Sequence, residues 1–194
     1  MARVPLIDRS KAKGEVKELY DAAARFLAPA ANADNLLGPE GSGMPQPFRV
    51  WAHSPGLGKW MLQGTIFFFN DCPWTTTHLQ LRQLIVLTVG KRLNSEFVCR
   101  HHADVSEKLG VSRDKIDALL DDLDSAKVSP LFNDEEKLLI EFADEMTRTG
   151  DVRAKLFEDV RRRYGNQAVV EVTGLIAFYL ATSSMCNVFR TEDD

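Results

Sequence analysis

The sequence lacks the signals of a secreted, membrane-spanning or nucleic-acid-binding protein. Its three cysteines, Cys72, Cys99 and Cys186, are an odd number without a CxxC pair, so neither a disulfide framework nor a zinc ribbon is expected. We expect no secretory leader, because residues 1–6 lack a charged start followed by an apolar stretch, and we expect no membrane span, because no apolar run approaches the required length. The longest basic block is 161–163 and the net charge is -4, which speaks against a nucleic-acid or membrane surface. We therefore expect a cytoplasmic protein whose partners are small molecules or further copies of itself.

Two catalytic signatures and nearly all strand signals are also missing. There is no Gly-x-Ser-x-Gly turn, which many hydrolases use, and no glycine-rich loop that would cradle a phosphate. No Asn-Gly or Asp-Gly pair separates alternating runs, whereas apolar residues recur at helical spacing almost throughout. The fold class is therefore predicted to be all-α. The chain of 194 residues can bury one sizeable core, and we expect that core in a helical domain over 45–194, after a segment 1–44 that holds one helix and a loop.

Capping residues and breakers predict where the helices begin and end. The first helix should run from Gly14 to about 28, where Pro29 stops it. The stretch 30–47, rich in Gly, Pro and Asn, is predicted to be a loop, either a lid or a plain surface connection. Further helices are expected at about 48–53, 55–69, 78–93, 95–110, 112–123, 133–149, 151–165 and 166–189.

Three of these helices carry additional signals. Residues 75–77, all threonines, offer caps for the helix that starts at about 78, and Asn133 with Glu136 is typical of a capping box. Segment 84–89 is apolar on every side, so its helix should be central. The last helix is rich in small residues, which suits close packing against neighbouring helices or another subunit.

The helix at 95–110 carries the chemistry that we expect. At 100° per residue one stripe contains Cys99 and His102, whereas His101 points elsewhere. Cys99 and His102 are three residues apart, so a thiol and an imidazole can share one partly buried pocket. Histidine moves protons near neutral pH, which makes His102 a candidate acid/base.

The same stripe is also compatible with a structural role or with a metal site. An inward histidine is often a hydrogen-bonded core residue, and a cysteine there is often a small core filler. Cys99, His101 and His102 could also hold a metal if a further ligand joined them, although no recognised metal spacing is present.

Several segments in order resemble one known family. They are Pro47-Phe48-Arg49, Ala52 to Leu57, Leu81 to Leu87, Phe97 to His102, Leu109 to Ser112 and Ala177-Phe178-Tyr179. Over residues 45–190 they resemble the carboxymuconolactone decarboxylase superfamily, which includes the alkylhydroperoxidase D-like proteins. The resemblance implies an all-α helical bundle that assembles into homo-oligomers, trimers or hexamers, with the site between helices near the subunit contact.

The sequence departs from the pattern of that family at several site positions. The two thiols of the peroxidase members correspond here to Ser95 and Val98, and their glutamate corresponds to Gln83. Where decarboxylase members carry Tyr-Glu-Trp, this chain has residues 97–99, Phe-Val-Cys. Thiol peroxidase chemistry needs an attacking thiolate and a resolving thiol, so these replacements argue against it.

The resulting hypothesis is a lyase or isomerase, without metal or organic cofactor, for a small cyclic metabolite that carries a carboxylate or a lactone. His102 would be the general acid/base and Gln83 would hydrogen-bond a carbonyl or enolate oxygen, with Cys99 beside them. Arg49, His53 and His101 are expected to contact the substrate. Two alternatives remain: a thiol redox protein that uses Cys99 alone, and a noncatalytic oligomeric binding protein on the same scaffold.

Overall fold

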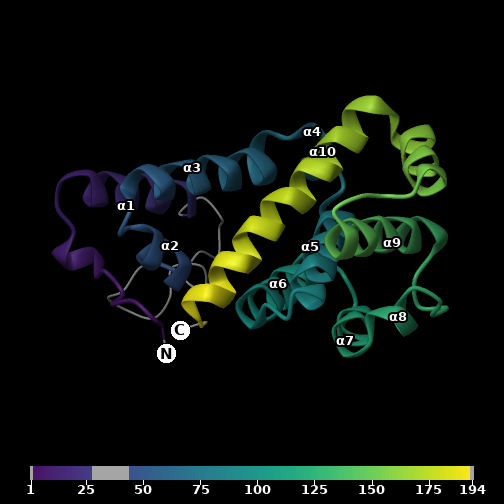
Figure 1. The fold of residues 1–194 in the computed structure, drawn as a ribbon, viewed down its shortest axis with the longest axis horizontal. Coiled ribbons are helices and arrows are strands. Elements are labelled where there is room, and N and C mark those ends of the chain that lie inside the picture. Colours follow the sequence, from purple (N-terminus) through teal and green to yellow (C-terminus); the bar gives the residue numbers. More distant parts are fainter. Residues whose placement is uncertain (1, 28–43, 193–194) are drawn as a thin grey trace. The chain divides into compact units, whose positions relative to one another are not determined.

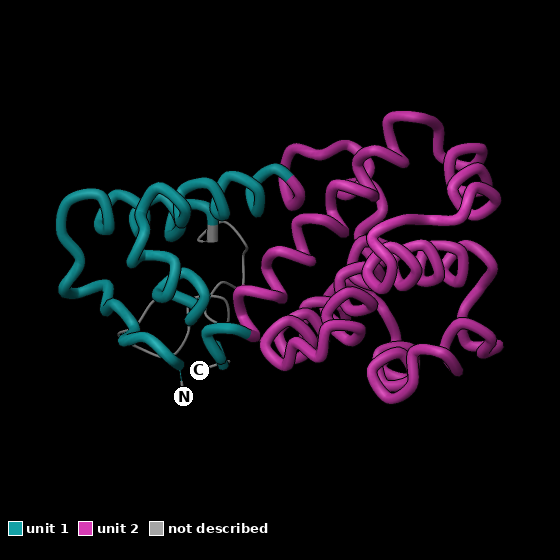
Figure 2. Tube along the Cα trace, in the orientation of Figure 1, with its two compact units in different colours: residues 1–67, 188–194 teal, residues 68–187 magenta. Residues whose placement is uncertain are grey.

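A computed structural model describes residues 2–27 and 44–192, and within these ranges every regular element is helical. The all-α prediction is therefore confirmed. Most of the loop predicted at 30–47, with its suggested role as a lid, lies outside the described residues. The chain forms two compact units, residues 1–67 with 188–194 (unit 1) and residues 68–187 (unit 2), coloured separately in Figure 2. The boundary that the sequence suggested between 44 and 45 stays a prediction.

Unit 1 is built around three α-helices. They are α1 (Gly14–Leu27), α2 (Gln46–Trp51) and α3 (Pro55–Ile66), preceded by a short 3-10 turn at Arg9–Lys11. Helix α1 packs closely on α3, because a Cβ placed on Gly58 would lie 2.5 Å from a methyl group of Leu19. Helix α2 lies two residues earlier than predicted and has a proline in its first turn, where the missing N–H costs nothing.

Unit 2 holds the remaining helices, of which Figure 1 labels the α-helices. They are the π-helical turn at Phe67–Asp71, which begins at the boundary of the unit, α4 (Pro73–Thr77), α5 (Leu79–Arg92), α6 (Glu96–Lys108), α7 (Arg113–Asp121), α8 (Leu123–Ala126), α9 (Asp134–Thr149) and α10 (Ala154–Phe189). Helix α5 packs against α6, α7 and α9, and each of its residues from Arg82 to Gly90 is buried. The prediction that this helix is central is therefore confirmed.

The expectation that residues 75–77 cap α5 is wrong. Pro73 opens a separate short helix, α4, that contains all three threonines. Their hydroxyls bond backward instead, as in the 2.6 Å contact from Thr75 Oγ1 to the carbonyl of Phe68. Backbone carbonyls of the preceding turn were thus the better partners for these hydroxyls. In contrast, the capping box predicted from Asn133 and Glu136 is present at the start of α9.

Helix α10 joins the two helices expected at 151–165 and 166–189. Gly165 has φ 87° and interrupts the helical backbone between them. An 18-residue window of α10 has a mean hydropathy of 1.5, so by length and composition alone this helix could cross a membrane. The expectation that no segment approaches a membrane span is therefore too strong. The core helix of a soluble protein passes the same test, and α10 carries buried residues such as Tyr179 and Cys186.

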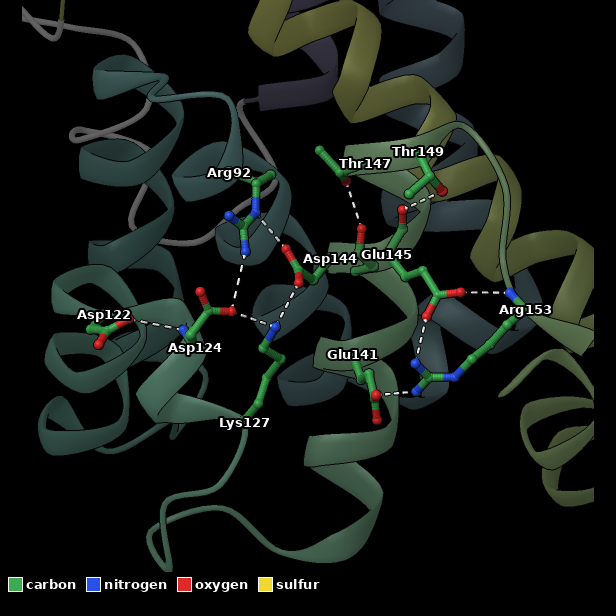
Figure 3. A network of polar contacts seen from close by, with 11 residues as sticks. Arg92, Asp122, Asp124, Lys127, Glu141, Asp144, Glu145, Thr147, Thr149 and Arg153 are labelled. Carbon is green, nitrogen blue, oxygen red and sulfur yellow. Dashed lines mark hydrogen bonds and ion pairs between the residues drawn. The ribbon is translucent and has the colours of Figure 1, made fainter. Parts of the chain in front are cut away.

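Buried charges join the helices of unit 2 (Figure 3). The carboxylate of Asp144 on α9 is almost fully buried. It forms ion pairs with Nε of Arg92 from α5 and with Nζ of Lys127 from the end of α8. Further along α9, Glu145 accepts hydrogen bonds from Arg153, just before α10. The Arg92–Asp144 pair joins α9 to the central helix α5, and the Glu145–Arg153 pair joins α9 to the segment before α10.

Candidate functional site

His102 lies where three helices of unit 2 come together, and its side chain is held on both ring nitrogens. The residue is only 6% exposed. Its Nδ1 lies 2.9 Å from Oε1 of Gln83 on α5, and its Nε2 lies 3.0 Å from the hydroxyl of Tyr179 on α10. The site is therefore a hydrogen-bonded chain of Gln83, His102 and Tyr179 contributed by α5, α6 and α10.

The partners of His102 define its protonation. An amide oxygen can only accept, so with Oε1 of Gln83 toward the ring, Nδ1 carries the proton. Burial lowers the pKa of His102 well below its ordinary value of 6.5, and the charges of His101 and Arg82 lower it further. The imidazole is thus neutral near pH 7, and Nε2 accepts the hydroxyl proton of Tyr179. Nε2 of His102 is therefore the basic atom of the site, and its electron pair accepts the hydrogen bond from Tyr179.

Tyr179 is a site residue that the sequence argument named only as part of the family resemblance. It sits in a mostly apolar helix, where an aromatic residue is usually core, so no local pattern singled it out. Its ring meets that of His102 edge to face, with centroids 5.2 Å apart. Burial raises the pKa of its hydroxyl far above the usual range, so the group stays protonated and acts as a donor.

Arg82, the neighbour of Gln83 on α5, is the second residue that sequence reasoning missed. It is only 4% exposed. Its Nη1 donates to the carbonyl of Thr75 over 3.3 Å, and its guanidinium lies 4.4 Å from the ring centre of Phe69. The Nε atom has no hydrogen-bond partner in the described part of the chain. A charged residue in the middle of a buried helix was the available signal, because arginine is seldom buried without a pair.

The π-helical turn at Phe67–Asp71 places the ring of Phe69 beside both His102 and Arg82. Phe69 contacts both the Arg82 guanidinium and the His102 ring, whose centroid is 6.2 Å from its own. Turns of this kind insert an extra residue into a helix and are frequent at functional sites. Gln83 completes the surroundings; it is fully buried, and its Nε2 has no partner among the described residues.

The stripe predicted on α6 is confirmed for His102 and only in part for Cys99. His102 is buried together with Val98 and Ser106, whereas Cys99 is half-buried. His101 is half-buried, stacks on Phe97 with centroids 5.5 Å apart, and meets the edge of His102. His101 is thus next to the central imidazole but outside the chain of hydrogen bonds.

Cys99 lies on the same stripe without joining the hydrogen bonds of His102. Its sulfur faces Gly90 of α5, where an added Cβ would lie 3.2 Å from Sγ. Burial raises the pKa of its thiol to about 11, so little thiolate forms near neutral pH. All three cysteines are free thiols.

Arg49 and His53 lie in unit 1, not in the unit that holds His102. His53 is exposed, and its Nε2 is 2.7 Å from the carbonyl oxygen of Pro5. Their expected contact with a substrate stays a prediction. In the described ranges, no group of three or more His, Cys, Asp and Glu residues is arranged to hold a metal ion.

Comparison with solved structures identifies the fold. A peroxidase-related protein from Silicibacter sp. TM1040 superimposes with a TM-score of 0.75 at 12% identity, over 100% of this chain and 92% of its own. The chain has the alkylhydroperoxidase D-like fold. The debrominase Bmp8, solved in complex with 2,3,4-tribromopyrrole, has this fold too, with a TM-score of 0.71 at 15% identity over 100% and 94% of the two chains.

A third structure with the alkylhydroperoxidase D-like fold comes from Agrobacterium tumefaciens. This protein of unknown function, a candidate AhpD of antioxidant defence, has a TM-score of 0.65 at 18% identity and covers 75% of this chain and 95% of its own. By sequence, the chain matches no protein-family profile and no curated relative. The expected resemblance is thus confirmed at the level of the fold, while the site must be interpreted from its own residues.

Proposed function

We propose that this chain is a cofactor-independent lyase or isomerase of the carboxymuconolactone decarboxylase-like kind, acting on a small cyclic metabolite that carries a carboxylate or a lactone. One observation carries the proposal: a buried, neutral His102 whose Nε2 is already paired with a protonated Tyr179. General acid/base catalysis requires a group that exchanges a proton with the substrate in a water-poor site. The His102 and Tyr179 pair supports this role, because it places a proton acceptor and a proton donor side by side.

The pair can move a proton in either direction. As a base, Tyr179 accepts a substrate proton while it passes its own proton to Nε2 of His102. The reverse transfer returns a proton to a different carbon, which completes an isomerisation. In a decarboxylation, the electron pair of the broken bond to CO2 enters the conjugated carbonyl, Tyr179 then gives its hydroxyl proton to carbon, and a proton from water restores the hydroxyl.

Gln83 contributes through both ends of its amide. Its Oε1 fixes the tautomer of His102 through Nδ1, which keeps Nε2 directed at Tyr179. Its Nε2 is a buried donor with no partner among the described residues, and such a donor is suited to an oxygen that gains negative charge. The neighbour Bmp8 holds a small halogenated pyrrole, which supports a small ring as the substrate of this chain as well.

The thiol redox alternative has less support. Cys99 has a raised pKa, and the positions of the two family thiols hold Ser95 and Val98. The binding-protein alternative rests on a different observation, since both ring nitrogens of His102 are already bonded within the chain. A histidine held in this way can also be structural.

The test compares matched histidine variants. Small cyclic carboxylates and lactones are screened for CO2 release or for a change in ultraviolet absorbance, and the active compound is then used with His102→Ala, His101→Ala and Gln83→Ala. We expect a loss of roughly a hundredfold or more for His102→Ala, because acid/base groups contribute at that scale. Gln83→Ala should lie between the two histidine variants. Full activity of His102→Ala with an unchanged circular dichroism spectrum would remove the catalytic role and favour the binding protein.

A further inference from the structure

Among the described residues, the guanidinium of Arg82 is a buried cation without an anionic partner. None of the ion pairs in this part of the chain includes Arg82. Its Nη1 donates to the neutral carbonyl of Thr75, and its guanidinium lies over the ring of Phe69. Tyr179 and Cys72 also lie close enough to affect its pKa, and neither carries a carboxylate. Glu171 of α10 accepts hydrogen bonds from the backbone N–H of Trp74 over 2.8 Å and from Nε2 of Gln167 over 2.7 Å.

Such a charge is costly unless something neutralises it. A buried guanidinium lacks its hydration shell, and a carbonyl and an aromatic face replace only part of it. The buried Nε of Arg82 also remains without a hydrogen-bond partner in the described part of the chain. Guanidinium groups bind carboxylates through two parallel N–H bonds, and here Nε is one of the donors still available for that contact.

We infer that Arg82 binds the carboxylate of the substrate and so selects anionic cyclic compounds at the His102 site. This inference rests on the proposed function and names the group that the substrate must carry. Arg82 is well placed for it, because Phe69 contacts both the guanidinium and the His102 ring. Since Arg82 and His102 both contact Phe69, a substrate ring bound to Arg82 through its carboxylate would lie next to Tyr179 and His102.

Binding of an anion here would also change the acid/base group. The positive charge of Arg82 is one of the causes that keep the pKa of His102 low. A carboxylate that neutralises this charge removes the smallest of these causes, whereas burial, the largest, remains. The bound anion would therefore make protonation of His102 less unfavourable during the reaction.

The experiment measures binding without turnover. Isothermal titration calorimetry compares pyrrole-2-carboxylate with its neutral amide, pyrrole-2-carboxamide, which has the same ring. We expect the wild type to bind the acid at least about tenfold more tightly than the amide, as a charge-assisted contact requires. Arg82→Gln should abolish this preference, and Arg82→Lys should keep part of it. Arg113→Gln, a loss of an exposed arginine paired with Asp117, is the matched control and should bind as the wild type does.

One further measurement separates this site from a merely structural arginine. Unliganded Arg82→Gln should have a Tm equal to or above that of the wild type, because a buried unpaired charge has been removed. His102→Ala should still prefer the acid, so a failure of the catalytic proposal and a failure of this one are distinguishable.

Three results would overturn the inference. The first is equal binding, or no binding, of the acid and the amide by the wild type. The second is a preference for the acid that survives in Arg82→Gln. The third is a lower Tm or loss of the fold in unliganded Arg82→Gln, because the arginine would then be stabilising the protein without an anion.

Discussion

At the scale of single residues, the site depends on the environment of a few ionisable side chains. His102 and Cys99 lie on one stripe of α6, and burial favours the uncharged form of both. It keeps the imidazole unprotonated and able to accept a hydrogen bond, whereas it keeps the thiol protonated and unreactive. The same desolvation therefore leaves Nε2 of His102 available as an acceptor and disfavours thiol chemistry.

The lowered pKa of His102 predicts how stability depends on pH. Unfolding releases the imidazole to its ordinary pKa of 6.5, so below that pH the unfolded state binds a proton that the folded state does not. Stability should be fully present above about pH 6.5 and should fall as the pH drops toward the lower folded pKa, by at most about 1.4 kcal/mol per pH unit. Urea unfolding between neutral and mildly acidic pH measures this slope. His102→Gln should flatten it, and an unchanged slope in that variant would assign the effect elsewhere.

Cys99 predicts the absence of thiol peroxidase turnover. With a pKa of about 11, its thiol is almost entirely protonated at neutral pH, and Ser95 and Val98 supply no resolving thiol. A hydroperoxide with a dithiol reductant should therefore show no turnover above the buffer rate, measured by peroxide consumption. Robust turnover that Cys99→Ser abolishes would promote the redox alternative.

At the scale of elements, the contact between α5 and α6 sets the position of the site. Gln83 and His102 face each other across these two helices, and further along Gly90 lets them approach. A Cβ at Gly90 would lie 2.9 Å from Cγ1 of Val98, closer than such atoms come, and 3.2 Å from the Cys99 sulfur, tighter than most contacts of this kind. The contact between α5 and α6 therefore leaves no room for a side chain at position 90 unless a neighbour shifts.

Gly90→Ala should therefore destabilise the protein although alanine is the better helix former. Overpacking typically costs about 1 to 3 kcal/mol, which exceeds the helix-propensity gain of roughly 1 kcal/mol. Chemical denaturation measures the change. Gly56→Ala in α3 is the matched control, because no atom lies within 4 Å of its added Cβ, and it should be neutral or slightly stabilising. Val98→Ala should restore stability to Gly90→Ala; if it does not, the contact at Gly90 is not what separates the helices.

At the scale of the whole molecule, we predict a homo-oligomer, as the family resemblance implies. Helix α3 presents Leu57 and Trp60 on one side, 40% and 56% exposed, and α10 presents Val170. Large apolar side chains at such positions are typical of surfaces that pair with a further copy. Light scattering should give an oligomer, a trimer or hexamer, and Trp60→Glu should shift it toward the monomer. A wild type that is monomeric at micromolar concentration would contradict the prediction.

The sequence by itself determined the fold class, the central position of α5, the capping box at Asn133 and the inward direction of His102. All of these depend on local periodicity or on neighbours a few residues apart, which a sequence displays directly. The threonines at 75–77 were misjudged because a cap and a backward hydrogen bond have the same local signature.

Only the tertiary structure decided what His102 touches. Gln83 and Tyr179 lie 19 and 77 residues away from it along the chain, and no local pattern encodes a contact over such separations. The role that we infer for Arg82 also required the tertiary structure, because a buried charge is informative only when the groups around it are known. Burial, and therefore the pKa of His102 and of Cys99, arises from the packing of α5, α6 and α10 together, which is a property of the folded chain and of no single segment.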